Sequence, residues 1–382
     1  WIINRYQAMV DELGFKSTEM AKIAKSINDL ATLPIEDNDF LYDTFLAAGE
    51  DNNAKLIAEY FRNNGIEARY VHPRQAGIFV SSEPGNARIL PGAYDKLEEL
   101  RESDEVLVIP GFFGVTPDNQ ICTFSRGGSD ITGSIVSRAV RATCYENWTD
   151  VSGFLIADPR IIDNPKPIKT ITYRELRELS YMGAGVLHED AVFPVRKAGI
   201  PINIRNTNAP EDEGTWIVES TCHQSKYTIT GIAGKKGFVS VNIDKDMMNS
   251  EIGFGRKVLS AFEDNGISFE HMPSGIDTMT IFVHQPEFEG KEQAVISAIH
   301  RYAQPDSIEL ESDLALIAVV GRGMKSTRGT AGRIFSALAH ANINVKMIDQ
   351  GSSELNIIIG VSNADFENAI KAIYDIFVIT QL

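Results

Sequence analysis

The stretch TFSRGGSD, residues 123–130, comes directly before the run ITGSIVSRAV at residues 131–140. Glycine pairs cost backbone entropy, so they are typical of tight turns or of places where the backbone approaches another group closely. The helical spacing of apolar residues after the pair predicts a loop that leads into a helix N-terminus, where free N–H groups attract anions. Arg126 could bind a carboxylate through both arms of its guanidinium. The alternative is an ordinary helix start capped by Ser129 or Asp130.

Length and composition place this stretch in an ordinary globular protein. The chain has 382 residues, enough for two or three domains, with 43% hydrophobic and 23% charged residues. A formal net charge of -16 argues against nucleic acid and anionic membranes as partners. Three cysteines without CxxC spacing indicate reduced thiols, and no apolar run approaches the roughly 18 residues of a membrane span. We therefore expect a cytoplasmic protein without a signal peptide.

The first half of the sequence predicts an α/β domain. Residues 1–60 have helical apolar spacing, and short β-rich runs then alternate with helices, of which 173–199 is the longest. Such alternation is typical of a mainly parallel sheet. The polar stretch at 206–221 is predicted to be the linker that leaves this domain.

The second half contains an internal repeat. The order β-α-β-β-α occurs twice, from GFVSVNID at 237–244 and from LALIAVVG at 314–321, as in ferredoxin-like domains. SIELES at 307–312 closes the first repeat, whereas the second ends without a closing strand. We expect the surplus strand at 226–233 to cross over and complete it. The predicted domains are 1–215, then 234–312, then 226–233 together with 313–382.

Several other features have ordinary explanations. GRGMKST at 321–327 follows a strand, but it lacks the Gly-Lys-Ser/Thr order of a phosphate loop and has Ser326 where a dinucleotide motif needs glycine. GKKG at 234–237 predicts a hairpin-type turn with solvated lysines. His188 is predicted to be packed or capping, and no histidine has metal-ligand spacing, so we expect no metal held by side chains.

A second informative stretch is WTDVSGFLIADPRIID at 148–163. Thr149 and Asp150 end a predicted strand, and ligands bind at the carboxyl ends of strands in open α/β sheets. Asp158 and Arg160 flank a proline turn, which would leave the arginine available for phosphate oxygens. The alternative is a solvated loop with a local ion pair.

Taken in order, FSRGGSD, WTDVSGFLIADPRI, ELSYMGAGVLHEDAVFP and IPINIRNTN, followed by two ferredoxin-like repeats, resemble the aspartate kinase (aspartokinase) family over essentially the whole chain. The resemblance implies a three-layer amino-acid-kinase domain of the carbamate-kinase type, joined to two ACT domains with one inserted in the other. It implies transfer of the ATP γ-phosphoryl group to the β-carboxylate of L-aspartate, with Mg²⁺ carried on the ATP phosphates. It also implies a homodimer or a dimer of dimers inhibited by an end-product amino acid, with lysine favoured over threonine.

The resemblance also assigns residues. Asp130 would be catalytic. The aspartate would be bound by Glu50, Phe112, Arg126, Gly127, Gly128 and Ser129. The nucleotide would be bound by Thr149, Asp150, Leu155 and Arg160. The effector would be bound by Met248, Gly253, Phe254, Ser268 and Glu270.

Two departures from the family pattern affect the expected activity. The family's Lys-Phe-Gly-Gly-Ser/Thr phosphate loop does not occur among these residues, and Gly183-Ala184-Gly185 stands where many members carry an ATP-contacting lysine. We therefore expect an enzyme truncated at its N-terminus, inactive by itself. The alternative is a catalytically incompetent regulatory chain that binds an amino-acid effector through its ACT domains.

Overall fold

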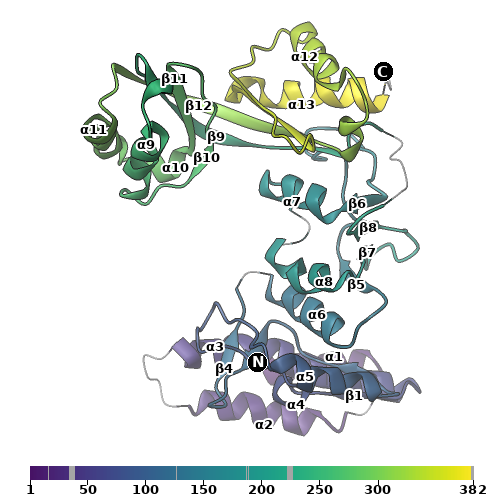
Figure 1. Cartoon of the computed structure of the whole chain (residues 1–382). Helices are drawn as coiled ribbons and strands as arrows, with labels where there is room; N and C mark the ends of the chain where they lie inside the picture. Colours follow the sequence, from purple (N-terminus) through teal and green to yellow (C-terminus); the bar gives the residue numbers. More distant parts are fainter. Residues whose placement is uncertain are drawn as a thin grey trace. The chain divides into compact units, whose positions relative to one another are not determined.

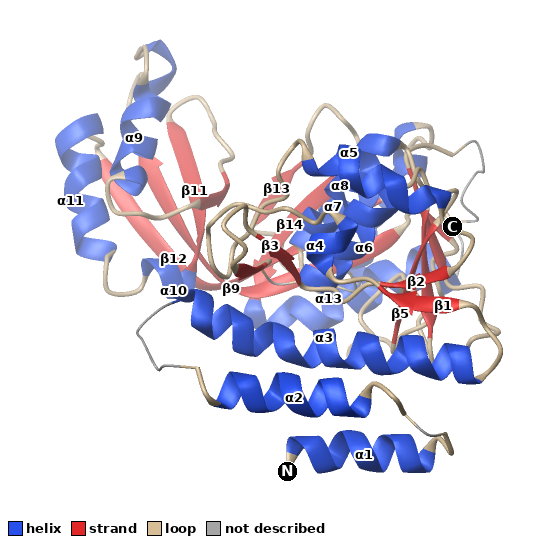
Figure 2. Ribbon diagram, turned by 90° about the horizontal axis from the view of Figure 1, so that it is seen from below, coloured by secondary structure: helices blue, strands red, loops and turns tan. Residues whose placement is uncertain are grey.

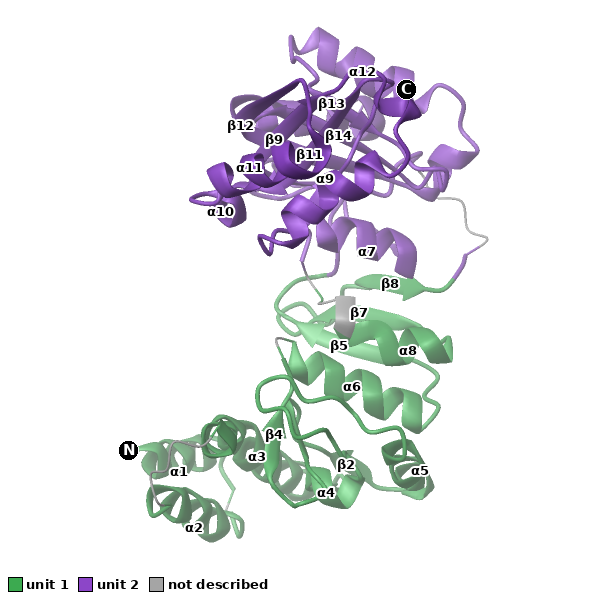
Figure 3. Cartoon of the chain, turned by 60° about the vertical axis from the view of Figure 1, so that its left-hand side comes forward, with its two compact units in different colours: residues 1–152, 187–219 green, residues 153–186, 220–382 purple. Residues whose placement is uncertain are grey.

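The computed structural model describes residues 1–15, 17–33, 39–125, 127–185, 187, 189–221 and 227–379. The chain forms two compact units, shown in different colours in Figure 3. Unit 1 consists of Trp1–Ser152 and Leu187–Glu219, and unit 2 of Gly153–Val186 and Ser220–Leu382. Both contain helices and strands, so the predicted α/β class is confirmed. Within the described ranges, no helix is long and apolar enough to cross a membrane.

The N-terminal part of unit 1 is mainly helical, as predicted for residues 1–60. Helices α1 (Ile2–Glu12), α2 (Met20–Ala31) and α3 (Asp39–Asn63) lie side by side, α1 on α2 and α2 on α3 (Figure 2). Their apolar faces meet at the buried side chains of Val10, Ile23 and Leu56. Burial of one apolar stripe per helix, rather than helix propensity, holds such a layer together.

The strands of unit 1 are short, and they pair in parallel, as expected, but also antiparallel. Parallel pairs join β1 (Ala68–Tyr70) to β2 (Val106–Val108) and β5 (Tyr145–Thr149) to β7 (Ile202–Asn206). Antiparallel pairs join β3 (Phe113–Val115) to β4 (Ile121–Thr123) and β7 to β8 (Thr215–Val218). The remaining elements of unit 1 are α4 (Pro73–Ala76), α5 (Ala93–Glu98), η1 (Glu99–Glu102), α6 (Gly128–Ala139), η2 (Glu189–Val192) and α8 (Phe193–Ala198).

Strand β8 lies inside the stretch that was predicted to be a linker. Thr215 and Ile217 are fully buried while Trp216 is exposed, which is the period-two pattern of a half-buried strand. The chain returns to β7 through Gly214, whose φ of 69° suits glycine and where a Cβ would lie 1.8 Å from the Ile204 carbonyl oxygen. The polar stretch therefore forms the second strand of a hairpin with β7.

The predicted helix at 173–199 is interrupted. Helix α7 (Tyr173–Tyr181) ends before Gly183, whose φ of 100° is left-handed, and α8 begins anew with Pro194 in its first turn. Both residues are typical breaks, because a positive φ and a missing N–H each end the helical hydrogen-bond ladder. His188, predicted to be packed or capping, lies outside the described residues.

Unit 2 is built around a six-stranded sheet. Its strand order is β10 (Phe269–His271), β11 (Thr278–His284), β9 (Gly231–Asp244), β12 (Ser307–Val320), β14 (Asn356–Ser362) and β13 (Met347–Asp349). The helices of the two repeats are α9 (Phe254–Glu263), α10 (Gln285–Phe288), α11 (Glu292–Ala303), α12 (Thr330–His340) and α13 (Phe366–Tyr374), labelled in Figure 1. The smaller elements are β6 (Thr170–Thr172), η3 (Met248–Ser250), η4 (Arg322–Lys325), η5 (Asn363–Asp365) and η6 (Asp375–Ile379).

The two long strands, β9 and β12, serve both repeats. Residues 238–244 of β9 pair with β11 and with the start of β12, while residues 231–236 pair with the end of β12. The register shifts in between, near Gly237 and Asp313, which both have positive φ. The strand expected at 226–233 thus begins at Gly231 in the structure. The domain bounds given above stay a prediction.

The predicted hairpin turn at GKKG is wrong, because residues 234–237 continue β9. A Cβ on Gly234 would lie 2.6 Å from the Phe366 ring and 2.7 Å from the Leu316 carbonyl oxygen. Lys236 pairs with Glu367 at 2.6 Å. The first glycine therefore permits close packing of a strand against α13 rather than a chain reversal.

Candidate active site and effector site

The loop between β2 and β3 meets the start of α6, and both are in unit 1. Phe112 has a φ of 79°, unusual for a bulky residue. Its N–H donates to the Thr132 hydroxyl on α6 at 3.0 Å, and its carbonyl accepts from the Phe124 N–H at 2.8 Å. Two hydrogen bonds thus hold this residue in a strained conformation, as is common at ligand-binding sites.

The glycines of the RGGSD stretch allow this contact. Gly127 precedes α6 with a φ of 80°, and Gly128 is buried in the first turn. A Cβ on Gly128 would lie 2.8 Å from the Phe112 ring and 3.1 Å from the Phe124 Cβ, so another residue would push the loop away. Gly111 approaches Ser129 in the same way, at 3.2 Å. The prediction of a close backbone approach at a helix start is confirmed.

Ser129 and Asp130 do not cap the helix, because both lie inside its first turn and Gly127 occupies the cap position. The Asp130 carboxylate accepts from the Asn147 side-chain amide on β5 at 2.8 Å, and the Asp130 carbonyl accepts from the Tyr145 hydroxyl at 3.3 Å. A carboxylate in the first turn also interacts favourably with the helix dipole. Asp130 therefore has a fixed orientation at the start of α6.

Tyr145 stays a neutral donor in this network. Burial, reinforced by the Asp130 charge and opposed by the hydrogen bond with Asn147, raises the pKa of Tyr145 to about 12. Gly133, one turn into α6, leaves room for the tyrosine, since a Cβ there would lie 2.6 Å from its hydroxyl oxygen. Asn147 is 8% exposed. Its role was not predicted, although its position two residues before Thr149 on the same strand face could have indicated it.

A buried carboxylate on α3 forms a hydrogen bond with the TFS stretch at residues 123–125. Asp43 is 1% exposed and accepts from the backbone N–H groups of Thr123 at 2.6 Å and Gly85 at 3.0 Å. It lies seven residues, about two helical turns, before Glu50. The distance between Asp43 and Glu50 along the helix does not predict this contact, because the strand that Asp43 binds is remote in sequence.

Glu50 itself is an exposed residue of α3. Its neighbours include Tyr6, whose hydroxyl donates to the Gly49 carbonyl at 3.2 Å. Burial raises the pKa of Tyr6, and the charges of Glu50 and Asp51 add to this. Among the described residues, no hydrogen bond or ion pair joins Glu50 to the Phe112 loop, and Arg126 lies outside those residues.

On the predicted nucleotide side, Thr149 is the last residue of β5, as expected, and Asp150 follows it exposed to solvent. The parallel neighbour β7 ends at the same level, with Asn206 opposite Thr149. The Thr149 carbonyl accepts from the N–H of Thr207 at 2.8 Å, and Asn206 donates to the Ser152 hydroxyl at 2.9 Å. Two strand ends therefore present polar groups together, as ligand sites in open α/β sheets do.

Leu155 and Arg160 belong to unit 2. Leu155 is half-buried and bridges to Pro167. The Arg160 side chain is 86% exposed and forms hydrogen bonds with both carboxylate oxygens of Asp158, the shorter of 2.6 Å from Nη2. These hydrogen bonds lower the pKa of Asp158. The local ion pair that was considered at this turn is therefore present.

The predicted effector residues fall into two groups. Met248, Gly253 and Phe254 lie in the turn that leads into α9, with Gly253 left-handed at a φ of 80°. Ser268 is exposed just before the edge strand β10, and Glu270 lies on that strand, half-buried. No hydrogen bond or ion pair between described residues joins the two groups.

The start of α9 also has a charged cluster that was not predicted. Glu251 pairs with Lys245 at 2.6 Å and with Lys257 at 2.5 Å, and these hydrogen bonds lower its pKa. The Lys245 ammonium lies 5.4 Å from the centroid of the Phe254 ring. The two lysines lie six residues before and six residues after Glu251 in the sequence, a spacing that does not by itself predict the cluster.

The described residues offer no ready-made metal site. Over the described ranges, no group of three or more His, Cys, Asp or Glu side chains is placed to hold a metal ion.

An α/β unit with a glycine turn is followed along this chain by two ferredoxin-like repeats, and comparison with known proteins identifies both parts. The profile of the amino acid kinase family matches residues 2–206, and that of an ACT domain matches residues 317–377. Aspartokinase 3 of Bacillus subtilis is 44% identical over 377 residues, which cover 98% of this chain and 83% of the relative. The chain therefore belongs to the aspartokinases, a family of enzymes within the amino acid kinases.

Solved structures agree with this assignment. Aspartate kinase of Clostridium acetobutylicum, described as an allosteric enzyme, has a TM-score of 0.86 and 45% identity, covering 98% of this chain and 83% of its own. Aspartokinase III of Escherichia coli, solved with aspartate and ADP, has a TM-score of 0.71 at 22% identity, covering 98% of this chain and 86% of its own. The second match supports the fold.

Proposed function

We propose that this protein transfers the γ-phosphoryl group of ATP to the β-carboxylate of L-aspartate, giving 4-phospho-L-aspartate. The observation that carries the proposal is the contact of Phe112 with Gly128 beside the oriented Asp130 carboxylate. Family membership supports the same reaction. A glycine turn at a helix start suits a small amino acid, because backbone N–H groups can reach its carboxylate directly.

Phosphoryl transfer needs positioning and charge stabilisation more than covalent help. We assign Arg126 to the α-carboxylate of aspartate, Glu50 to its ammonium group and Phe112 to one wall of the site. Asp130, held by Asn147, orients the groups around the transferring phosphoryl. Thr149, Asp150, Leu155 and Arg160 are assigned to ATP.

Mg²⁺ would reach this site on the ATP phosphates and reduce their negative charge. We also propose that the protein works in the cytoplasm as a homodimer formed through its ACT domains, since ACT effector sites commonly form across a two-fold interface.

The reaction can be tested on the full-length protein with Mg-ATP and L-aspartate, trapping the acyl phosphate with hydroxylamine. We expect aspartyl hydroxamate with aspartate and little product with L-glutamate, whose carboxylate is one methylene further out. Absence of hydroxamate would favour the alternative of a regulatory chain without catalysis. Equal rates with glutamate would contradict the substrate assignment.

Two substitutions assign the substrate side. Arg126→Ala should raise the KM for aspartate strongly and leave ATP binding almost unchanged, because losing one partner of a buried charged contact costs roughly 2–5 kcal/mol. Asp130→Asn should lower kcat at least about tenfold, since one hydrogen-bonded charge at the reacting centre is lost. Asp104→Asn, an exposed residue of unit 1, is the matched control. Equal effects on aspartate and ATP would place Arg126 on the wrong ligand.

We further propose feedback inhibition by lysine, with threonine, alone or together with lysine, as the alternative. The effector carboxylate would meet the turn at Met248, Gly253 and Phe254, and Glu270 and Ser268 would bind its polar groups. Calorimetric titration with each amino acid, repeated with Glu270→Ala, tests the site. Unchanged binding in that variant would show that the effector binds elsewhere.

A further inference from the structure

A single buried hydroxyl on α6 holds the loop that carries Phe112. Thr132 lies just after the first turn of α6 and is 4% exposed. Its oxygen accepts a hydrogen bond from the Phe112 N–H at 3.0 Å, and its hydrogen is donated to the Gly128 carbonyl at 2.9 Å. Thr132 thus connects the loop between β2 and β3 to the glycine turn at the start of the helix.

The direction of both hydrogen bonds is fixed by their partners. A carbonyl only accepts, so the hydroxyl hydrogen of Thr132 goes to Gly128, four residues earlier, as threonines within helices often arrange it. The oxygen lone pairs are then left for the Phe112 N–H, which only donates. Because Thr132 is buried, water has little access to replace either bond. The contact therefore requires a hydroxyl group at this position.

The contact matters because Phe112 has an unfavourable backbone conformation. Its φ of 79° lies in the left-handed region, which a bulky residue adopts only when its surroundings impose it. The Phe124 N–H holds the carbonyl of Phe112 at 2.8 Å, and Thr132 holds its N–H. Loss of the Thr132 hydroxyl would release the N–H side of the residue, and the loop would be free to relax to a negative φ.

The position of the Phe112 ring determines how much space lies over the glycine turn. A Cβ on Gly128 would lie 2.8 Å from the ring, so the ring and the turn are already in contact. Gly111 approaches the next residue of the turn, since a Cβ on it would lie 3.2 Å from the Ser129 Cα. A loop that relaxed would move away from the turn, because these contacts leave no space in the other direction. The space available to a substrate there would then increase.

We propose that Thr132 is a positioning residue that sets the specificity of the reaction: it keeps Phe112 over the glycine turn and thereby excludes acids longer than aspartate. This inference rests on the proposed function, which places the acceptor substrate at the same turn. An enzyme discriminates one methylene group in an apolar site by about 10- to 200-fold. Thr132 acts through Phe112, because its hydroxyl is bonded to that residue and to Gly128.

The test is the ratio of kcat/KM for L-aspartate to that for L-glutamate, measured on the full-length protein with Mg-ATP and hydroxylamine trapping. Thr132→Val has almost the same shape but neither donates nor accepts, and we expect it to lower this ratio at least about tenfold. Thr132→Ser keeps the hydroxyl and should keep the ratio of the wild type. A merely structural role would lower kcat/KM for both acids alike and leave the ratio unchanged.

Hydrogen exchange measured by mass spectrometry tests the contact without any activity. Thr132→Val should raise the exchange rate of the peptide that contains Phe112, because that amide loses its acceptor, whereas Thr132→Ser should not. Thr143→Val, at an exposed threonine of unit 1, is the matched control and should change neither the exchange nor the ratio.

Phe112→Gly decides the question if Thr132→Val is too unstable to assay. Glycine adopts a φ of 79° without strain, so the backbone is kept while the ring is lost. This variant should also lower the ratio at least about tenfold, and adding Thr132→Val to it should lower the ratio no further, because Thr132 acts through the ring.

An unchanged ratio in Thr132→Val would overturn the assignment, whether or not the exchange rate rises, and so would an unchanged ratio in Phe112→Gly. Absence of hydroxamate from the wild type would instead overturn the proposed reaction, and the specificity role with it. The wild type alone decides the second question, and the variants decide the first, so the two failures can be told apart.

Discussion

Replacing Glu175 by glutamine should strongly destabilise unit 2. Glu175 lies in the first turn of α7 and is fully buried. Its carboxylate accepts from the Thr230 hydroxyl at 2.6 Å, from the Arg322 N–H at 2.9 Å and from the Arg322 guanidinium at 2.8 Å. It also accepts from the Thr172 N–H at 2.9 Å, which completes the capping box of α7. One side chain therefore connects three segments of unit 2.

The size of the effect follows from burial and charge. Glutamine has nearly the same shape, but it turns one acceptor oxygen into an NH₂ group that faces other donors. Removing one partner of a buried ion pair costs about 3–5 kcal/mol. The Arg322 side chain is 21% exposed and can be partly solvated, so we expect the lower end, about 3 kcal/mol. This corresponds to a change of roughly a hundredfold in the unfolding equilibrium.

The assay must report on unit 2. Trp1, Trp148 and Trp216 all lie in unit 1, so tryptophan fluorescence would miss the change. Hydrogen exchange measured by mass spectrometry in urea, on peptides from α7 and β9, follows the right segments. Glu178→Gln is the matched control on the same helix. Among the described residues, the Glu178 carboxylate accepts one hydrogen bond, from the Asn356 amide at 2.6 Å, and glutamine can still accept it.

Glu178→Gln should cost less than about 1 kcal/mol. If Glu175→Gln cost no more than this control, the buried ion pair would not be a stabilising contact, and the reasoning would be refuted.

The pH dependence gives an independent check. Burial alone would raise the pKa of Glu175, but the hydrogen bonds from Thr230, Arg322 and Thr172 outweigh it and hold the pKa below the ordinary 4.5. The unfolded state then binds the proton more readily, so the stabilisation is complete above pH 4.5 and is lost as the pH falls through the lower, folded value. The stability difference between wild type and Glu175→Gln should therefore shrink on acidification below pH 4.5.

Two further predictions concern the active site. Gly128→Ala should raise the KM for aspartate at least about tenfold, because the new Cβ would lie 2.8 Å from the Phe112 ring; a wild-type KM would show that the loop yields without cost. Tyr145→Phe removes the hydrogen bonds with Asp130 and Asn147 and should lower kcat a few-fold without changing its pH profile near neutrality, because the pKa of Tyr145 is about 12; a new slope there would contradict this.

Local features of the fold could be predicted from the sequence. The helical character of residues 1–60 follows from apolar spacing, and the glycine turn before α6 follows from two adjacent glycines before a helical run. Thr149 could be placed at a strand end from the local sequence pattern around it. Each of these predictions depends on residues within a few positions of one another, so the local sequence is sufficient to predict the structure there.

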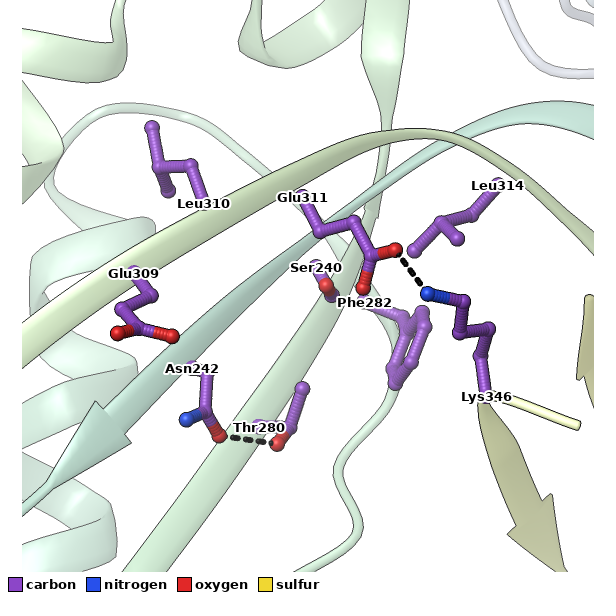
Figure 4. A pocket seen from close by; sticks show the side chains of 9 residues that line it. All are labelled: Ser240, Asn242, Thr280, Phe282, Glu309, Leu310, Glu311, Leu314 and Lys346. Carbon is purple, nitrogen blue, oxygen red and sulfur yellow. Dashed lines mark hydrogen bonds and ion pairs between the residues drawn. The ribbon is translucent and has the colours of Figure 1, made fainter. Parts of the chain in front are cut away.

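Features made by remote partners could not be predicted. The carboxylate of Asp43 binds a strand 80 residues further on, and that of Glu175 binds a loop 147 residues further on. GKKG has the composition of a turn, yet packing against Phe366 keeps it in a strand. A pocket in unit 2 is lined by Ser240 of the first repeat and by Lys346 of the second (Figure 4). In each case tertiary contacts outweigh local preference.

The family match and the packing of the chain divide it at different places, which bears on how regulation could act. Residues 153–186 lie inside the amino acid kinase match, yet they pack in unit 2 with the ACT repeats. Ile232 of β9 donates its N–H to the Ile156 carbonyl at 2.6 Å, and the Lys166 N–H donates to the Tyr374 hydroxyl at 3.0 Å. These bonds flank the predicted nucleotide residue Arg160. Any ligand that shifts β9 or α13 must therefore strain or move the backbone around that residue, and such a difference in contacts is what a coupling free energy between two sites requires.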